Sequence, residues 1–262
     1  MSPPLLSVAG LSKRFRRGDA MIDAVSGVSL DVHAGETLAL VGPSGSGKST
    51  LARLILRLIE PDAGTIRFDG LDLLSLRGAA LRAARARLQM VFQDPHAAFN
   101  PRATVARVLA DPLRIHGIAT RAERPAAIGR LLEGVDLPAS FAARAVHDLS
   151  GGQRQRVAIA RAIAPAPKLV VLDEAVSALD VSTRRRILAL LADLQKAHGI
   201  AYLFVTHDLA AVRLIAHRVA VMDRGAIVET GSVDEVVGNP RSATARALVA
   251  AQPRLPARSE AT

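Results

Sequence analysis

The stretch "VGPSGSGKST" at residues 41–50 follows the apolar run "TLAL" and matches the spacing G-x-x-x-x-G-K-[ST]. Glycines let the backbone curl so that successive N–H groups point inward and form a concave site for an anion. The N-terminus of the helix expected to follow adds a partial positive charge. The stretch therefore predicts a loop that binds phosphate at the end of a buried strand.

The residue types inside this loop indicate a triphosphate with magnesium. Lys48 is placed to reach the outer phosphates, and the hydroxyl of Ser49 is offered to Mg²⁺. A glycine-rich turn without a ligand is the plainer alternative, but it does not require a lysine and a serine in this register. The spacing is not that of a dinucleotide site, G-x-G-x-x-G. We expect the nucleotide to be bound by Gly42, Pro43, Ser44, Gly45, Ser46, Gly47, Lys48, Ser49 and Thr50.

A carboxylate for the metal is expected at the end of another strand. The run "LVVLDE" places Asp173 where an apolar strand ends and Glu174 directly after it. In α/β sheets the ligand crevice lies at the carboxyl ends of the strands. An acidic pair at such a place can also be a helix cap. Beside a phosphate loop we expect Asp173 to hold Mg²⁺ and Glu174 to polarise the attacking water.

A second glycine stretch, "DLSGGQRQRVAIARA" at 148–162, has a serine and two glycines at the start of an amphipathic basic helix. This arrangement offers another backbone site for phosphate. One nucleotide needs only one such loop, yet the chain has two different ones. The simplest explanation is a dimer in which each nucleotide is enclosed by different loops of two chains.

The rest of the pattern favours an α/β fold. Near-continuous apolar runs are typical of parallel strands covered on both faces, and they occur at 37–41, 88–92, 168–173, 201–206 and 218–223. Helical patterns lie at 48–58, 78–87, 151–164, 181–198 and 208–216. Shorter alternating segments before residue 70 predict a small antiparallel layer, and residues 98–164 predict an inserted helical lobe.

Composition narrows the classes of function. The chain has no cysteine, which excludes a disulfide framework, a thiolate zinc site and an iron–sulfur cluster. The net charge of +10 is dispersed, with local clusters only at 13–17 and 184–186, and one tyrosine without tryptophan offers little for base stacking. We therefore expect no nucleic acid partner. No apolar stretch approaches the ~20 residues of a membrane span, and we expect a cytoplasmic location.

With these motifs the chain resembles the ATP-binding subunits of ABC transporters over nearly its whole length. The stretch L-S-G-G-Q at 149–153 is the signature of that family, and "SALD" at 177–180 matches its D-loop. Gln93 in "MVFQDP" matches the Q-loop glutamine, and His207 in "VTHDL" matches the switch histidine. Phe15 in "LSKRF" matches the aromatic residue that stacks on adenine, although a lone phenylalanine near a strand can equally be a core residue.

The resemblance implies a P-loop NTPase core of mainly parallel sheet, with an N-terminal antiparallel layer and an inserted helical subdomain at about 98–164. It implies an ATP-binding domain over 5–237 and a C-terminal extension with a polar tail over 238–262. ATP and Mg²⁺ are the implied cofactors, with Ser49, Gln93 and Asp173 around the metal. Glu174, Gln93 and His207 are the implied catalytic residues, and Asp180 couples the two sites of a dimer. The opposite chain's ATP is implied to meet Leu149, Ser150, Gly151, Gly152 and Gln153.

The sequences of two segments resemble those of the peptide/nickel importer subfamily. These are "QMVFQDPHAAFNPRATV" and the stretch from "DEAVSALDVSTRRR" to "VTHDLAAV". The shortness of the chain and its lack of cysteine are closest to the second ATPase subunit of nickel importers. Nickel, a metal chelate such as a metal–opine complex, and short peptides remain open as the cargo.

Such a subunit implies several partners at the cytoplasmic face of the inner membrane. They are two integral-membrane permeases, a second ATPase chain (a sister or another copy) and, indirectly, a periplasmic or extracytoplasmic substrate-binding protein. Similarity places the permease contact near Asn100 to Val105. A non-transport ABC ATPase acting on nucleic acid or ribosomes is the alternative, but such proteins usually carry coiled-coil insertions or two fused ATPase units.

Overall fold

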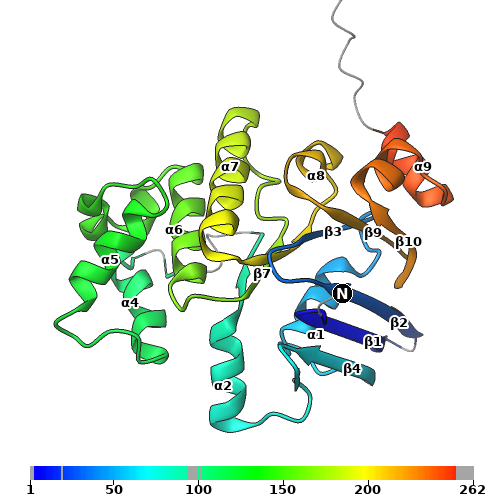
Figure 1. Ribbon diagram of the computed structural model, residues 1–262, viewed down its shortest axis with the longest axis horizontal. Coiled ribbons are helices and arrows are strands. Elements are labelled where there is room, and N and C mark those ends of the chain that lie inside the picture. Colours follow the sequence, from blue (N-terminus) through cyan, green and yellow to red (C-terminus); the bar gives the residue numbers. More distant parts are fainter. Residues whose placement is uncertain (1–2, 19, 94–98, 101, 252–262) are drawn as a thin grey trace, which may run out of the picture.

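The structure is a computed structural model that describes residues 3–18, 20–93, 99–100 and 102–251. It contains a mainly parallel sheet, a small antiparallel sheet and a helical lobe at one end (Figure 1). The expected fold class is confirmed. The large sheet has the strand order β10-β9-β3-β8-β7-β6. Its strands are β3 (Thr37–Val41), β6 (Leu88–Val91), β7 (Leu169–Asp173), β8 (Ala201–Val205), β9 (Arg218–Asp223) and β10 (Ala226–Ser232).

Continuous apolar sequence explains the centre of this sheet. Every residue of β3, β7 and β8 is buried, and β9, β3, β8, β7 and β6 pair in parallel. At the edge of this sheet β10 pairs antiparallel with β9. The strands lie within two residues of the ranges predicted from the sequence. Because parallel strands end at the same edge, the segments that follow β3, β7 and β8 meet there.

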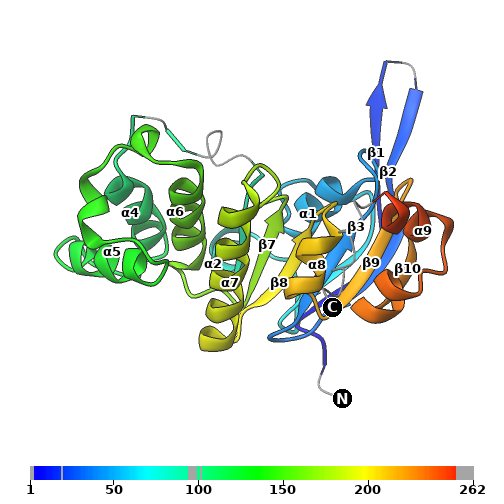
Figure 2. The same ribbon diagram turned by 90° about the horizontal axis from the view of Figure 1, so that it is seen from above.

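The small sheet has the order β2-β1-β4-β5. Its strands are β1 (Leu6–Arg17), β2 (Ala20–Val32), β4 (Ala63–Phe68) and β5 (Leu71–Asp72). Helix α1 (Lys48–Ile55) lies between the two sheets, where Leu51, Leu54 and Ile55 are fully buried. The hairpin of β1 and β2 extends beyond the rest of the molecule (Figure 2).

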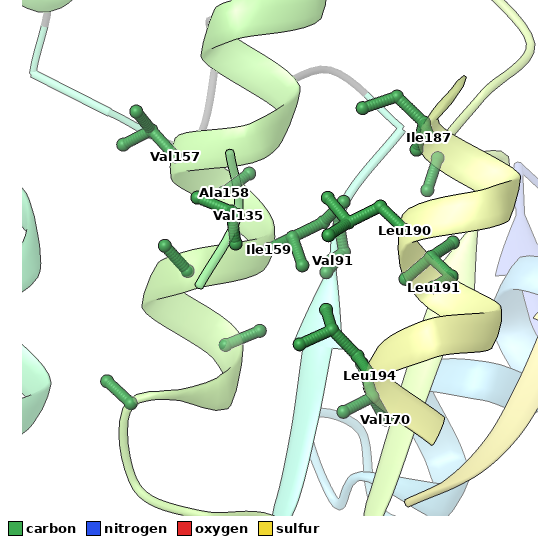
Figure 3. Close-up of a cluster of buried hydrophobic side chains, with 14 of the residues drawn as sticks. Val91, Val135, Val157, Ala158, Ile159, Val170, Ile187, Leu190, Leu191 and Leu194 are labelled. Carbon is green, nitrogen blue, oxygen red and sulfur yellow. The ribbon is translucent and has the colours of Figure 1, made fainter. Parts of the chain in front are cut away.

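The other face of the large sheet is covered by helices. These are α7 (Val181–His198), α8 (Leu209–Ile215) and α6 (Gly151–Ile163). Leu190, Leu191 and Leu194 of α7 pack toward Ile159 of α6 and Val170 of β7 (Figure 3). One apolar cluster thus joins the parallel sheet to the helical lobe. The lobe comprises α4 (Val105–Ile115), α5 (Arg124–Glu133), two short 3-10 turns (Ala139–Ala143 and Val146–Asp148) and α6.

Three further elements belong to the described chain. Helix α2 (Gly78–Arg87) leads into β6, and α9 (Ala243–Ala250) follows the short π-helix Asp234–Gly238. None of the described helices has both the length and the apolar character that crossing a bilayer requires.

The expected boundary between an ATP-binding domain and an extension, at residue 237, falls inside the π-helix. Val236 and Val237 pack in one cluster with Ala245 of α9. The carboxylate of Glu229 in β10 accepts hydrogen bonds from the backbone N–H groups of Arg241 and Ser242, at 2.9 and 2.7 Å. Helix α9 is therefore continuous with the core, and the division at 237 stays a prediction. The tail at 252–262 lies outside the described residues.

Candidate functional site

The phosphate loop connects β3 to α1, as the sequence predicts. Gly47 has φ +104°, and a Cβ there would lie 2.2 Å from the carbonyl oxygen of Ala24, so only glycine fits. Gly47 also precedes α1 without any side-chain cap on the helix. The first N–H groups of α1 therefore remain available to an anion.

Lys48 is buried in this loop, with 6% of its surface exposed. Its Nζ donates hydrogen bonds to the carbonyl oxygens of Gly42 and Pro43, both at 2.9 Å. Burial lowers the pKa of Lys48, while the charges of Glu174 and Asp173 oppose that shift. The ammonium of Lys48 thus lies near the two acidic residues. The carbonyl oxygens that now accept its hydrogen bonds can be replaced by phosphate oxygens.

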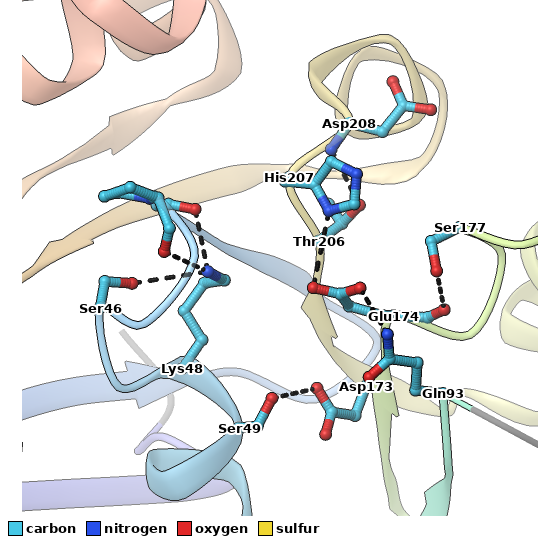
Figure 4. Close-up of polar contacts among 12 residues, drawn as sticks. Ser46, Lys48, Ser49, Gln93, Asp173, Glu174, Ser177, Thr206, His207 and Asp208 are labelled. Atoms are coloured by element: carbon cyan, nitrogen blue, oxygen red, sulfur yellow. Dashed lines mark hydrogen bonds and ion pairs between the residues drawn. The ribbon is translucent and has the colours of Figure 1, made fainter. Parts of the chain in front are cut away.

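Asp173 ends β7 and is 3% exposed. Its Oδ1 accepts a hydrogen bond from the hydroxyl of Ser49 at 2.9 Å (Figure 4). Burial raises the pKa of Asp173, and the bond from Ser49 and the charge of Arg53 oppose the shift. A desolvated carboxylate beside a hydroxyl is suited to a cation.

Glu174 follows with its backbone in the left-handed region, at φ +47°. Its N–H bonds to the carbonyl of Val205 at 2.9 Å, which ties it to β8. Its carboxylate lies 3.0 Å from Nε2 of Gln93 and 3.5 Å from Nδ1 of His207 (Figure 4). Non-glycine residues in this conformation are uncommon and cluster at functional sites. The distances show that the three expected catalytic side chains, Glu174, Gln93 and His207, lie together.

The donor set fits magnesium. Ser49, Asp173 and Gln93 supply hydroxyl, carboxylate and amide oxygens, the hard ligands that Mg²⁺ prefers. Among the described residues no group of three or more His, Asp or Glu side chains could hold a metal.

The signature stretch, residues 149–153, lies elsewhere in the chain. Ser150 is exposed and caps α6, and its side chain accepts from the N–H of Gln153 at 3.3 Å. The Gln153 side chain accepts in return from the N–H of Ser150 at 3.1 Å, which completes a capping box. Helices α6 and α1 are well separated in both views, with β7 between them (Figures 1 and 2). A single chain does not bring its two glycine loops together.

The two remaining predicted residues are placed differently. Phe15 lies on the projecting hairpin opposite Ile22, is 38% exposed, and has Lys13 Nζ 5.7 Å from its ring centre. The core alternative for Phe15 is therefore wrong. Asp180 caps α7 by accepting from the N–H of Thr183 at 2.9 Å, and this bond holds the pKa of Asp180 well below its usual range.

Sequence reasoning gave Ser177 no role of its own within the D-loop match, and it missed the pair of Arg184 and Asp208. The hydroxyl of Ser177 donates to the carbonyl oxygen of Glu174 at 2.9 Å. Arg184 reaches Asp208, the residue after His207, at 2.5 Å. The arginine cluster at 184–186 was the only signal for the second contact, and it does not say which arginine turns inward.

Comparison with known proteins supports this arrangement. Residues 25–177 match the family model described as ABC transporter. A protein of Brucella ovis named as a peptide import ATP-binding protein is 46% identical over 250 residues, covering 95% of this chain and 79% of the relative. The glutathione import ATP-binding protein GsiA of Escherichia coli O6:H1 is 48% identical over 257 residues, covering 95% of this chain and 41% of GsiA.

Solved structures of ABC ATPase cassettes have a similar fold. The dimeric, post-hydrolysis structure of the ATP-binding cassette MJ0796 with ADP and Pi has a TM-score of 0.77 at 30% identity, covering 87% of this chain and 98% of that one. CbiO1 of Clostridium perfringens, part of the ABC transporter complex CbiONQ, has a TM-score of 0.79 at 28% identity, covering 91% and 92%. The chain therefore belongs to the ABC transporter family, as its motifs predicted, and is an ATP-binding ATPase of that family.

Proposed function

We propose that this chain is the ATP-hydrolysing subunit of an ABC importer, and that two ATPase chains enclose MgATP between them. The observation that carries this proposal is the meeting of Lys48, Asp173 and Glu174 at the end of the parallel sheet. Phosphoryl transfer needs positioning and charge stabilisation more than covalent help from the protein. This edge of the sheet supplies both.

Each side chain has a distinct role in the proposal. Lys48 and the N–H groups of residues 42–50 bind the phosphates, and Phe15 stacks on adenine. Glu174 accepts the proton of the attacking water, and Gln93 and His207 hold its carboxylate and the γ-phosphate in line. Ser49, Gln93 and Asp173 would hold Mg²⁺, which would supply positive charge against the charge that develops on the phosphate oxygens.

The dimer follows from the placement of the signature stretch. Helix α6, which Ser150 caps, lies apart from helix α1 that follows the phosphate loop. In the proposal Ser150, Gly151 and Gly152 complete the site of a second chain, with Leu149 and Gln153 at its edges. The exposed start of α6 supports this role. The MJ0796 cassette bound to ADP and Pi is described as dimeric. Asp180 lies in the loop that couples the two sites.

Glu174→Gln tests the hydrolytic assignment. The substitution keeps the volume but removes the charge that accepts a proton, and a positioned general base contributes about 10²–10⁴-fold. Phosphate release should fall by that factor while ATP binding persists and the Ser150 loop becomes protected from proteolysis. Glu133→Gln, an exposed residue at the end of α5, is the matched control. Near wild-type hydrolysis by Glu174→Gln would contradict the assignment.

The permease is proposed to dock in a groove beside the site. This groove of about 190 Å³ is lined by Leu58, Phe92, Phe99 and Arg161. Leu58 and Phe92 are 52% and 40% exposed, and Phe92 immediately precedes Gln93. A segment bound there lies next to the catalytic glutamine, which supports coupling. Of the expected contact segment 100–105, residue 101 lies outside the described residues.

Two variants test this contact. Leu58→Asp should break co-purification with the permeases and uptake while basal ATP hydrolysis continues. Leu214→Asp on α8, where the leucine is 60% exposed, should change neither. Uptake by Leu58→Asp at the wild-type rate would place the permease elsewhere.

For the cargo we propose short peptides ahead of nickel or a metal chelate, because the relatives are named for peptide and glutathione import. Uptake of a labelled dipeptide, of glutathione and of ⁶³Ni²⁺ by cells with and without the gene separates these. Such an importer places the chain at the cytoplasmic face of the inner membrane, with two permeases, a second ATPase chain and a substrate-binding protein. Recovery of ribosomes or DNA without a permease would favour the non-transport alternative.

A further inference from the structure

Three consecutive arginines in the first turns of α7 differ in their surroundings. Arg185 and Arg186 are exposed. The Arg184 side chain is 27% exposed, and its Nε is fully buried. One member of a charge cluster is thus taken into the protein while its neighbours remain in solvent.

The guanidinium of Arg184 spans two loops of the site. Its Nη1 donates to Oδ2 of Asp208 at 2.5 Å. Its Nη2 donates to the carbonyl oxygen of Leu179 at 3.0 Å and makes a longer contact of 3.5 Å with that of Ser177. Asp208 directly follows His207 (Figure 4). One side chain therefore joins the loop that follows Glu174 to the loop that carries His207.

Each loop also has anchoring contacts of its own. Asp208 uses its other oxygen to cap α8, accepting from the N–H groups of Ala210 and Ala211 at 2.9 and 3.2 Å. On the other loop, the Ser177 hydroxyl holds the carbonyl of Glu174, and Asp180 caps α7. These contacts fix each loop to its own helix or strand. The bonds of Arg184 run between the loops.

This arrangement is poorly suited to stability alone. The Nε–H of Arg184 is buried without a hydrogen-bond partner in the described part of the chain, and an unmade bond of this kind carries a desolvation cost. Ion pairs taken out of water often contribute little net stability. The planar guanidinium of Arg184 instead fixes the position of Asp208 relative to the carbonyl of Leu179, because its N–H donors point in fixed directions.

We propose that Arg184 is a positioning residue that locks the Ser177–Asp180 loop to His207. A shift of that loop, caused by a second chain pressing on it near Asp180, then moves Asp208 and His207 relative to the carboxylate of Glu174. The inference rests on the proposed hydrolytic function. It adds a mechanical link between the dimer contact and the water-activating groups.

The test is Arg184→Gln in the full chain, with Arg185→Gln as a control of equal charge change on the next residue. Displacing catalytic groups by about 1 Å can cost on the order of 10²-fold. We expect kcat to fall about 10- to 100-fold with KM and the Kd for ATP unchanged. Arg184→Lys, which keeps one charge but not the fork, should give an intermediate kcat.

A second readout does not depend on activity. Hydrogen exchange of the amides at 175–180 and at 206–211 should accelerate together in Arg184→Gln, and neither should change in Arg185→Gln. Asp208→Asn should lose kcat to a similar extent, and the double variant should lose no more than either single one.

Separate results overturn the separate claims. Unchanged kcat and exchange in Arg184→Gln, equal losses in Arg185→Gln, or a kcat loss that tracks the folded fraction would each overturn the positioning role. Full activity of Glu174→Gln would instead overturn the hydrolytic assignment on which the role rests.

Discussion

The two glycine loops of this protein, the phosphate loop and the signature stretch, differ in how closely the rest of the same chain packs around them. In the phosphate loop, a Cβ on Gly47 would lie 2.2 Å from a backbone oxygen. Lys48 is buried and bonded to the loop's own carbonyls. In the signature stretch, a Cβ on Gly151 would meet only Leu179 Cδ2, at 3.7 Å. Ser150 is exposed and bonds to Gln153.

The phosphate loop is therefore complete within one chain, whereas the signature stretch is one half of a site. The phosphate loop lies between a buried strand and a buried helix, so the fold of one chain fixes its shape. The signature stretch keeps its shape through a capped helix start. Gly151 there is open, whereas a Cβ on Gly152 would lie 2.6 Å from Cγ2 of the Thr183 side chain. Changes in the first loop should therefore alter a single chain, whereas changes in the second should appear mainly when two chains meet.

The largest expected difference concerns nucleotide binding by the single chain. Lys48→Ala removes the ammonium that faces the phosphates, and loss of one partner of a buried charge pair costs about 2–5 kcal/mol. Titration with a fluorescent ATP analogue should show this loss, with exposed Lys196→Ala as the control. Ser150→Ala should leave the affinity of the single chain unchanged. A comparable loss in Ser150→Ala would break the contrast.

The glycines should differ in their effect on folding. Gly47→Ala forces a side chain onto a left-handed backbone beside the carbonyl of Ala24. Backbone strain of this kind costs about 1–3 kcal/mol, and the overlap should bring the loss in unfolding free energy to its upper end. Gly151→Ala enters an open helix start and should be neutral. Urea unfolding of both variants measures the difference, and equal destabilisation would show that the two loops are equally crowded.

A smaller effect on nucleotide binding is expected from the contact with the adenine base of ATP. Phe15→Ala should weaken ATP binding by about 1–3 kcal/mol, since that is the contribution of one base–aromatic stack. Phe15→Tyr should bind nearly as well as the wild type. The same analogue titration applies. A loss as large as that of Lys48→Ala would mean that the projecting hairpin does more than stack on adenine.

The smallest expected effect is on the capping box. Ser150→Ala removes the side-chain acceptor at the start of α6 and should lower the unfolding free energy by about 1 kcal/mol. Ser150→Asp restores a cap without restoring a hydroxyl for phosphate. Thermal unfolding should therefore rank the aspartate variant above the alanine variant. Loss of the fold in Ser150→Ala would show that the signature stretch, too, is part of the core.

The sequence predicted elements and site residues better than it predicted contacts. Buried strands such as 201–205 are continuous apolar runs, and the phosphate loop has fixed spacing, so both can be identified locally. The order of the strands depends on pairings between distant segments, which periodicity does not encode. The inward turn of Arg184 was missed for the same reason, because Asp208 lies 24 residues further along the chain.

The order of the large sheet also bears on how the protein is synthesised. Strand β8 lies between β3 and β7, so the phosphate loop and the carboxylate that faces it are brought together by a strand made after both. A nascent chain that has emerged only as far as β7 holds the glycine loop but lacks the strand to which Glu174 is tied. We therefore expect nucleotide to bind only once residues 201–205 have been inserted. Its binding should then stabilise the completed sheet against reopening on the ribosome.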